Sequence, residues 1–366
     1  MVGQISRAQV LTFRVCAQQL DRGSTTVAAS AALDIGVQDT GPDGGLWALA
    51  IRGVDVSSLK SHELVTVWSV RGAPHRYRRG DLPSVAAAVE PFSDADAGKR
   101  IYDAAKPLKA AGIANLVALD WIAAAMRSVV AGPMLKGDVS ARVAELADAP
   151  YLRSCRPCNA THLYEMPFRL SALRAALELQ AGTSPPMLTP IPGFAPMSTP
   201  SKDHEIIRAY LRLLGPATPR HVASYLDAAL KDVKARWPSD AVEVSVDGET
   251  RWVLAADKDR FGEGPTSTAR LLGPFDLFLQ ARDRSLLVDD PTRAKALWPV
   301  LGRPGAVLVG DEIVGTWRPR KSGMKLTVRM ELWTKTSTSV RGALTEQAER
   351  LAAYRQVRLS GIDFTS

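Results

Sequence analysis

Residues 201–256 constrain the fold most, because they carry three short helical patterns in close succession. Apolar side chains recur at helical spacing from Ile206 to Leu214, which predicts the first helix. Thr218 and Pro219 suit the N-cap and the first residue of a second helix. A third apolar pattern ends at a proline, which stops a helix. This spacing predicts a helix-turn-helix arrangement.

Two alternating apolar runs follow these helices. Residues 242–246 and 251–254 flank Asp247 and Gly248, a pair that favours the tight turn of a β-hairpin. Three helices followed by a hairpin make a winged helix-turn-helix, a common DNA-binding module. A plain three-helix bundle would not need the hairpin.

Weaker copies of this pattern precede it and predict an architectural repeat. The first copy comprises helices at residues 6–20 and 24–33, a short apolar segment at 47–52 and a strand at 64–71. The second comprises helices at residues 115–130 and 139–147, a third helix at 151–158, a wing strand at 160–165 and a trailing helix at 169–179.

The rest of the chain differs in composition. Six prolines fall within residues 183–200, so we expect a linker with no helix or inner strand there. Short β-rich runs after residue 262 predict a small antiparallel sheet or barrel, closed by an amphipathic helix at 344–357.

The expected fold class is therefore α+β, with tandem winged helix-turn-helix modules followed by a small C-terminal antiparallel β-barrel. The expected segments are module 1 (1–95), module 2 (96–182), a Pro-rich linker (183–200), module 3 (201–260), and the barrel with its closing helix (261–366).

Charge and hydropathy indicate the partner and the compartment. The net charge of +8 over 366 residues favours a polyanionic partner, because Lys and Arg replace counterions on nucleic acid. No apolar run reaches the roughly 18 residues of a membrane span, and the N-terminus lacks a signal-peptide core. We expect a cytoplasmic protein that does not bind membranes.

The three cysteines give no metal or redox motif. Cys155 and Cys158 form a C-x-x-C with His162 nearby, but no fourth ligand of suitable spacing accompanies them. No βαβ pattern surrounds them as a redox pair would require. We expect no metal and no cofactor.

Three stretches in chain order carry a further signal. They are residues 33–50, with Gln38 ahead of a Leu/Trp/Ala-rich helix; residues 68–75, which read Trp-Ser-Val-Arg-Gly-Ala-Pro-His; and residues 272–284 with 314–318, which begin Leu-Gly-Pro-Phe-Asp and end Val-Gly-Thr-Trp-Arg. Together they resemble the AlkZ/YcaQ-type bacterial DNA glycosylases, whose winged-helix and β-barrel fold agrees with the pattern above.

The resemblance implies hydrolysis of the N-glycosidic bond of alkylated or crosslinked purines. A guanine alkylated at N7 is already cationic and leaves without a strong general acid. The enzyme must position a water at the sugar carbon and stabilise a cationic transition state. Two polar side chains two residues apart on an extended segment face the same way and can hold that water.

The family pattern at this place is Gln-Φ-Gln or Gln-Φ-Asp, with Φ apolar. Gln38 matches the first position, Asp39 replaces the apolar residue, and Thr40 takes the second polar position. The resemblance implies that Gln38 orients the water, helped by Asp39 in a loop or by Thr40 on a strand. Residues 38–44 also suit a polar turn between two helices.

Two basic clusters are candidates for DNA contact. The first, interleaved with Tyr77, suits phosphate contact and base stacking; its alternative is a solvated loop. The second lies on a predicted C-terminal hairpin; its alternative is a charged, exposed β-edge. The candidates are Arg71, His75, Arg76, Arg78, Arg79, Arg318, Arg320 and Lys321.

The sequence thus predicts a monomeric DNA glycosylase whose partner is damaged double-stranded DNA. Two alternatives belong to other classes. One is a non-catalytic winged-helix DNA-binding protein that binds damage or regulates transcription. The other is a winged-helix module that binds protein, whose affinity for DNA would lack the steep salt dependence of phosphate contacts.

Overall fold

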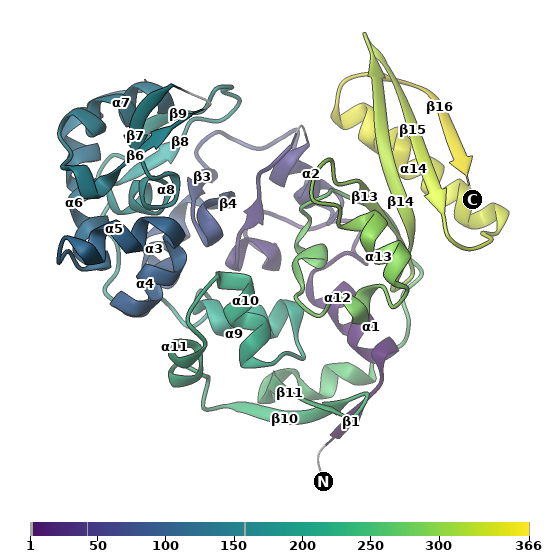
Figure 1. Cartoon of the computed structure of the whole chain (residues 1–366). Coiled ribbons are helices and arrows are strands. Elements are labelled where there is room, and N and C mark those ends of the chain that lie inside the picture. Colours follow the sequence, from purple (N-terminus) through teal and green to yellow (C-terminus); the bar gives the residue numbers. More distant parts are fainter. Residues whose placement is uncertain (1–2, 42, 157–158, 366) are drawn as a thin grey trace. The chain divides into compact units, whose positions relative to one another are not determined.

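A computed structural model describes residues 3–41, 43–156 and 159–365 and shows a mixed α+β protein (Figure 1). The chain divides into two compact units. Unit 1 comprises Met1–Leu59, Tyr210–His221 and Pro238–Ser366; unit 2 comprises Lys60–Ala209 and Val222–Trp237.

The first helix of unit 1 is α1 (Arg7–Ala17), which has a capping box at its N-terminus: the Ser6 side chain accepts from the Gln9 backbone, and the Gln9 side chain accepts from the Ser6 backbone. After the turn η1 (Ala31–Asp34) and the two-residue strand β2 (Val37–Gln38), helix α2 (Gly44–Ala50) carries the apolar segment seen in the sequence.

The helix expected at residues 24–33 is wrong, because only η1 at its end is helical. The Thr26 hydroxyl accepts from the Ala29 backbone at 3.2 Å, a local bond that competes with helix formation. The Gln19 side chain binds the Ala29 carbonyl at 2.9 Å and the Ala31 amide at 3.0 Å. These long-range partners hold the segment as a turn.

The predicted hairpin is confirmed. Strands β10 (Ala241–Val246) and β11 (Glu249–Leu254) pair around Asp247 and Gly248, whose φ angles of 49° and 83° give the expected tight turn. Strand β1 (Gly3–Ile5), which the sequence did not reveal, pairs in parallel with β10 (Figure 1).

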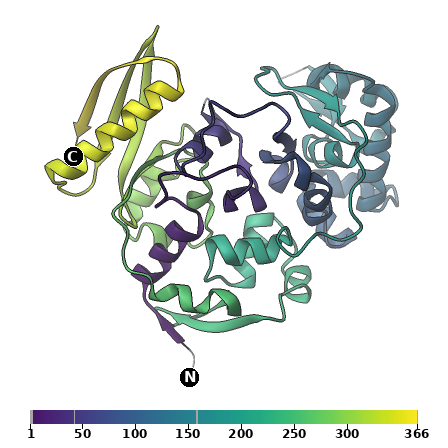
Figure 2. The ribbon, with the colours of Figure 1, turned by 180° about the vertical axis from the view of Figure 1, so that it is seen from behind.

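The C-terminal part of unit 1 is a five-stranded sheet. Its strands run in the order β12 (Ala269–Leu272), β13 (Gly305–Val309), β14 (Glu312–Ser322), β15 (Lys325–Leu332) and β16 (Arg358–Thr365). Helix α14 (Thr338–Tyr354) lies along it (Figure 2). No pairing between described residues joins β12 to β16, so closure into a barrel is not confirmed. The expected closing helix is instead followed by the edge strand β16.

Short helices connect β11, β12 and β13. They are η6 (Ala255–Gly262), η7 (Leu277–Gln280), α12 (Arg284–Leu287) and α13 (Pro291–Leu297). The side chain of Asp276 caps η7 through the Phe278 amide, and that of Asp290 caps α13 through the Thr292 and Arg293 amides.

Unit 2 packs helices on a small sheet whose strands run in the order β4 (Pro74–Arg78), β3 (Leu64–Trp68), β8 (Leu177–Leu179), β9 (Met187–Pro190) and β5 (Met134–Leu135). The helices are α3 (Leu82–Val89), α4 (Asp94–Arg100), α5 (Ala105–Ala110), α6 (Asn115–Val129), α7 (Lys136–Glu145), α8 (Glu165–Arg174) and α11 (Leu230–Ala235). The main core gathers around Leu119, Met126 and Phe168.

Two expectations in unit 2 are wrong. Strand β9 lies within residues 183–200 and pairs on both sides, so the proline-rich stretch does hold an inner strand. Its last residue, Pro190, has no backbone N–H and therefore donates no hydrogen bond at that end of the strand. The helix expected at 151–158 is a hairpin strand, β6 (Leu152–Cys155), paired with β7 (Ala160–Leu163). Pro157 and Cys158 lie outside the described residues.

The three helices predicted between residues 201 and 237 are confirmed. They are α9 (Ile206–Leu214), α10 (Pro219–Leu226) and α11. The Thr218 hydroxyl accepts from the His221 amide at 3.2 Å, as an N-cap does. Residues 201–260 contribute to both units, and the division into five segments stays a prediction.

Within the described residues, no single helix is long and apolar enough to cross a membrane. The bent pair Tyr102–Ala110 and Asn115–Val129 meets the length and composition test only when taken together. Leu108, Leu119 and Met126 of that pair lie in the core of unit 2.

A buried ion pair joins the turn after α2 to the loop after β12. Arg52 and Asp276 have fully buried side chains and make two parallel bonds of 2.7 and 2.8 Å. Arg52 also donates to the Ala48 carbonyl and to the Gln18 backbone and side chain. All the polar contacts that a buried guanidinium requires are therefore met inside unit 1.

A second buried network surrounds Asp283. Arg14 of α1 binds this carboxylate at 3.0 and 2.7 Å, and Arg251 of β11 binds it as well. Arg14 also donates to the Gly215 carbonyl at 3.0 Å. Burial would raise the pKa of Asp283, but the charges of Arg14 and Arg251 outweigh it and hold the pKa below its ordinary value.

We predict that Asp276→Ala lowers the free energy of unfolding by about 3–5 kcal/mol, because it leaves the Arg52 guanidinium buried and unpaired. Urea denaturation measures the loss. Glu312→Ala, which breaks the partly exposed pair with Arg7, is the control and should cost under about 1 kcal/mol. Equal losses in the two variants would contradict the assigned role of burial.

We predict that the stability gap between the wild type and Asp283→Asn shrinks at acid pH. A carboxyl whose pKa is lower in the folded state stabilises the fold above its unfolded pKa of about 3.9, and this contribution is lost as pH falls through the folded pKa. Thermal unfolding between neutral pH and about pH 3 tests this. A constant gap would show that Asp283 is not held as a carboxylate.

Candidate active site

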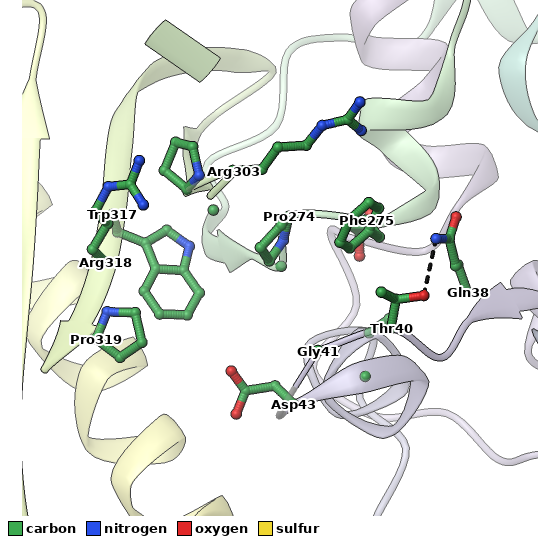
Figure 3. Close-up of a pocket in the computed structure, with 16 residues that line it drawn as sticks. Gln38, Thr40, Gly41, Asp43, Pro274, Phe275, Arg303, Trp317, Arg318 and Pro319 are labelled. Carbon is green, nitrogen blue, oxygen red and sulfur yellow. Dashed lines mark hydrogen bonds between the residues drawn. The ribbon is translucent and has the colours of Figure 1, made fainter. Parts of the chain in front are cut away.

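A cavity of about 240 Å³ lies in unit 1 (Figure 3). Its wall combines the segment after β2, the loop after β12, the loop before β13, and β14. The lining residues whose chemistry matters most are Gln38, Thr40, Asp43, Phe275, Asp276, Arg303, Trp317 and Arg318. Segments that lie more than 200 residues apart in the sequence therefore meet at one cavity.

Gln38 and Thr40 face each other in this cavity. The amide nitrogen of Gln38 donates to the Thr40 hydroxyl oxygen at 3.0 Å (Figure 3). This bond leaves the Gln38 carbonyl oxygen and one lone pair of Thr40 available as acceptors. The two residues that the sequence placed on one side of an extended segment are thus brought together.

Asp39 has a different position. It is not among the residues that line the cavity, and its carboxylate accepts from the Gly45 amide at 2.7 Å. Asp39 thereby caps helix α2, because the N-cap residue, Asp43, makes no side-chain hydrogen bond to the first turn of the helix. Gly44 has a φ of 51°, and a Cβ there would lie 2.2 Å from the Asp39 carboxylate oxygen, so a larger residue would strain the backbone and displace the Asp39 side chain.

The carboxylates that line the cavity are both held by arginines. Asp276 binds Arg52, as described above. Asp43 binds both Nε and the terminal nitrogen of Arg355, which follows α14. The Tyr354 hydroxyl donates to the Asp43 carbonyl at 2.8 Å. The polar atoms of the wall that can still accept a hydrogen bond therefore include those of the neutral side chains of Gln38 and Thr40.

Two tryptophans fix the wall. The Trp47 indole donates to the Leu271 carbonyl, and the Trp317 indole to the Leu272 carbonyl, each at 2.8 Å. The Trp317 ring passes directly over Gly305, where a Cβ would lie 2.1 Å from the indole nitrogen. A larger residue at Gly305 would push Trp317 out of the wall.

An aromatic ring and two arginines complete the cavity. The Arg303 guanidinium lies 5.4 Å from the centre of the Phe275 ring, in cation–π contact (Figure 3). Arg318 lines the cavity next to the buried Trp317 and is itself exposed. The wall thus offers a flat ring and positive charge beside Gln38 and Thr40.

The first predicted DNA-binding cluster lies in unit 2 and makes internal contacts. Arg71 donates to the Tyr225 carbonyl and lies 4.8 Å from the centre of its ring. His75 is only 2% exposed, and its Nδ1 lies 3.1 Å from the Ser69 hydroxyl and 3.0 Å from the Ala73 carbonyl. Both residues have structural partners that the sequence did not indicate.

The other members of this cluster lie at strand β4 and just after it. Arg78 pairs with Asp81 at 2.8 Å and Arg79 with Glu178 at 2.6 Å, while Arg76 is half-buried. DNA contact by these residues stays a prediction. Such contact would compete with the ion pairs of Arg78 and Arg79.

The second cluster lies on the hairpin of β14 and β15. Arg318, Arg320 and Lys321 are exposed, and Arg318 is directly opposite Arg329 in the ladder. Like charges that face each other across a ladder repel. A polyanion on this face would relieve that repulsion.

Sequence reasoning missed several residues of the cavity. Asp43 lies in a stretch whose composition indicates only a polar turn, Phe275 lies within the Leu-Gly-Pro-Phe-Asp motif, and the sequence gives no sign of a role for Arg303. Arg303 stands in a Gly-Arg-Pro-Gly stretch that is typical of a loop. Only the folding of β13 beside β12 and β14 brings it to Gln38.

Comparison with known proteins adds two matches. A family model described as AlkZ-like DNA glycosylase matches residues 35–354. Among solved structures, Streptomyces sahachiroi DNA glycosylase AlkZ matches with a TM-score of 0.74 and 20% identity, covering 99% of this chain and 100% of that one. No curated protein sequence matches. At this identity the structural match shows the shared fold.

We predict that Gly44→Ala destabilises the protein more than Gly41→Ala. Both glycines have positive φ, so each substitution strains the backbone by about 1–3 kcal/mol. Nothing lies within 4 Å of a Cβ at Gly41, whereas Gly44 also meets Asp39. Urea denaturation compares the two, and Asp39→Ala should remove the difference. Equal costs would contradict the packing of Asp39 on α2.

Proposed function

The chain belongs to the AlkZ-like DNA glycosylase family, and from that premise we propose that it releases alkylated or crosslinked purines at the Gln38 cavity. Membership makes it a DNA glycosylase, a hydrolase of N-glycosyl bonds that acts on DNA. The observation that carries the proposal is the hydrogen-bonded pair of Gln38 and Thr40 inside the cavity.

The Gln38–Thr40 pair suits the binding of a nucleophilic water. A water that attacks carbon needs acceptors for its protons, so that a lone pair points at the sugar. The Gln38 carbonyl oxygen and the free lone pair of Thr40 are two such acceptors, two residues apart. We assign the role of the second polar residue in the Gln-Φ-Gln or Gln-Φ-Asp pattern to Thr40 and not to Asp39, because the Asp39 carboxylate caps α2.

The charges around the cavity suit a leaving group that needs no proton. Asp43 and Asp276 are each held by two bonds from an arginine, so neither is placed as a mobile general acid. A purine alkylated at a ring nitrogen is cationic and departs as a neutral base. The flat ring of Phe275 offers a stacking surface for it.

Damaged double-stranded DNA is the partner we propose, bound by a monomer. The net charge of +8 and the exposed basic face of β14 and β15 favour a polyanion. The three helices between residues 206 and 235 and the hairpin of β10 and β11 supply the elements of a winged helix. We also propose that the chain is built from tandem winged-helix modules with a barrel-like C-terminal region, and that these elements bind the DNA.

We predict that Gln38→Ala slows single-turnover release of N7-methylguanine from duplex DNA by about a hundredfold or more, because it removes an oriented partner of the water. Thr40→Val should slow release by about tenfold or more, since a lone-pair acceptor worth over about 1.4 kcal/mol in the transition state is lost. Thr40→Ser, which keeps the hydroxyl, is the matched control. Asp39→Asn should stay close to the wild type, because an amide oxygen can still cap α2.

Two results would contradict this assignment. If Asp39→Asn released methylguanine about a hundredfold more slowly while Thr40→Val released it at the wild-type rate, the Asp39 carboxylate would be the second partner of the water. Absence of release by the wild type, with DNA binding that weakens as salt rises, would exclude N7-methylguanine as a substrate. Thermal unfolding of each variant shows whether the fold is retained.

A further inference from the structure

The loop between α13 and β13 presents two bare apolar side chains. Val300 is 95% exposed and Leu301 is 86% exposed, more than any other large apolar residue in the described chain. Single exposed apolar residues are ordinary on a protein surface. Two adjacent ones at the tip of a loop would gain free energy from burial against a partner, which the isolated protein does not provide.

This loop borders the cavity. Arg303 follows Leu301 by two residues, and Arg303, Pro304 and Gly305 all line the cavity that contains Gln38. Gly302, with a φ of 64°, makes the turn between the apolar tip and Arg303. The tip therefore stands at the edge of the proposed active site and belongs to the same unit.

Both ends of the loop are anchored. Trp298 ends α13, its amide donates to the Ala294 carbonyl at 2.9 Å, and the Arg284 guanidinium lies 4.9 Å from the centre of its ring. Pro304 is buried at the other end, and Arg303 lies over Phe275. Because both ends of the loop are held in this way, inserting Val300 and Leu301 into a binding partner costs little conformational entropy.

The base of the loop is positively charged. Neither Arg284 nor Arg303 forms an ion pair with a carboxylate among the described residues; each contacts an aromatic ring instead. Burial and the nearby charge of Arg303 lower the pKa of Arg284, as expected when two guanidiniums share a site. Arg318 adds an exposed positive charge to the same cavity. The positive charges at this edge of the cavity favour an anionic partner.

We infer that Val300 and Leu301 form a wedge that enters the base stack of duplex DNA beside the purine held at the cavity. Arg303 and Arg284 bind the flanking phosphates. Apolar side chains that part a base step are a known way for proteins to open and bend DNA. Two side chains are too few for a stable protein interface, which needs about 800 Å² per partner, but they fill the gap of one base step. The inference rests on the proposed function.

Fluorescence of 2-aminopurine tests the wedge without needing catalysis. The probe is a short duplex with a tetrahydrofuran abasic analogue, which a glycosylase cannot cleave, and with 2-aminopurine in the neighbouring pair. The wild type should raise the fluorescence several-fold on binding, because the base next to the wedge loses its stacking. Val300→Ser/Leu301→Ser should abolish the rise and weaken binding by at least about tenfold.

Matched variants separate the wedge from other effects. Leu301→Phe keeps an insertable side chain and should retain the rise. Val117→Ser removes a 58% exposed valine from α6 and should change neither binding nor fluorescence. Gln38→Ala should keep the full rise while it loses release of methylguanine. Because Val300 and Leu301 make so little packing contact, the double variant should unfold at the wild-type temperature.

The outcomes are distinct. Binding by the wild type without a fluorescence rise, or an equal rise in the double variant, overturns the wedge. A change confined to sedimentation, from dimer to monomer, also overturns it and makes the loop an interface between copies. A rise without release of methylguanine by the wild type supports the wedge and counts against the proposed substrate. Failure of the wild type to bind the duplex overturns both.

Discussion

The cavity depends on two buried arginine–carboxylate contacts. Arg52 holds Asp276 and Arg14 holds Asp283, and in each the side chains are almost fully removed from water. A buried charge is tolerated only when it is paired and hydrogen-bonded, so these contacts have few alternative geometries. They fix α1 and α2 against the segment after β12. Gln38 and Phe275 consequently meet at one wall although they lie more than 200 residues apart.

These ion pairs limit the chemistry that the groups lining the cavity can perform. Its carboxylates are engaged by arginines, and the acceptors that remain toward the cavity on Gln38 and Thr40 belong to neutral groups. Such groups can orient a water but cannot protonate a leaving base. A site that orients a water but donates no proton suits a substrate whose base already carries positive charge. The exposed basic residues of β14 include Arg318, which itself lines the cavity and adds positive charge to its wall.

Local signals in the sequence were sufficient where the structure depends on nearby residues. The Asp247-Gly248 turn needs only positive φ at two positions, and the Thr218 cap needs only the next turn of its helix. The failures have the opposite cause. Residues 24–30 lack a helix because Gln19 binds the backbone there, and β9 is an inner strand because β5 and β8 lie on either side. In both cases partners outside the segment contribute, in the first case together with the local bond from the Ala29 amide to Thr26.

The sequence by itself determined the α+β class, the helices and the hairpin between residues 206 and 254, the family, and the place of Gln38 and Thr40 on one side of an extended segment. The tertiary structure decided which neighbour of Gln38 shares the cavity, because Asp39 finds the Gly45 amide. It also gave Arg71 and His75 internal partners and brought Arg303 to the cavity. The physical reason is that propensity and periodicity act over a few residues. Ion pairs, burial and cavity walls join residues that only the packed chain brings together.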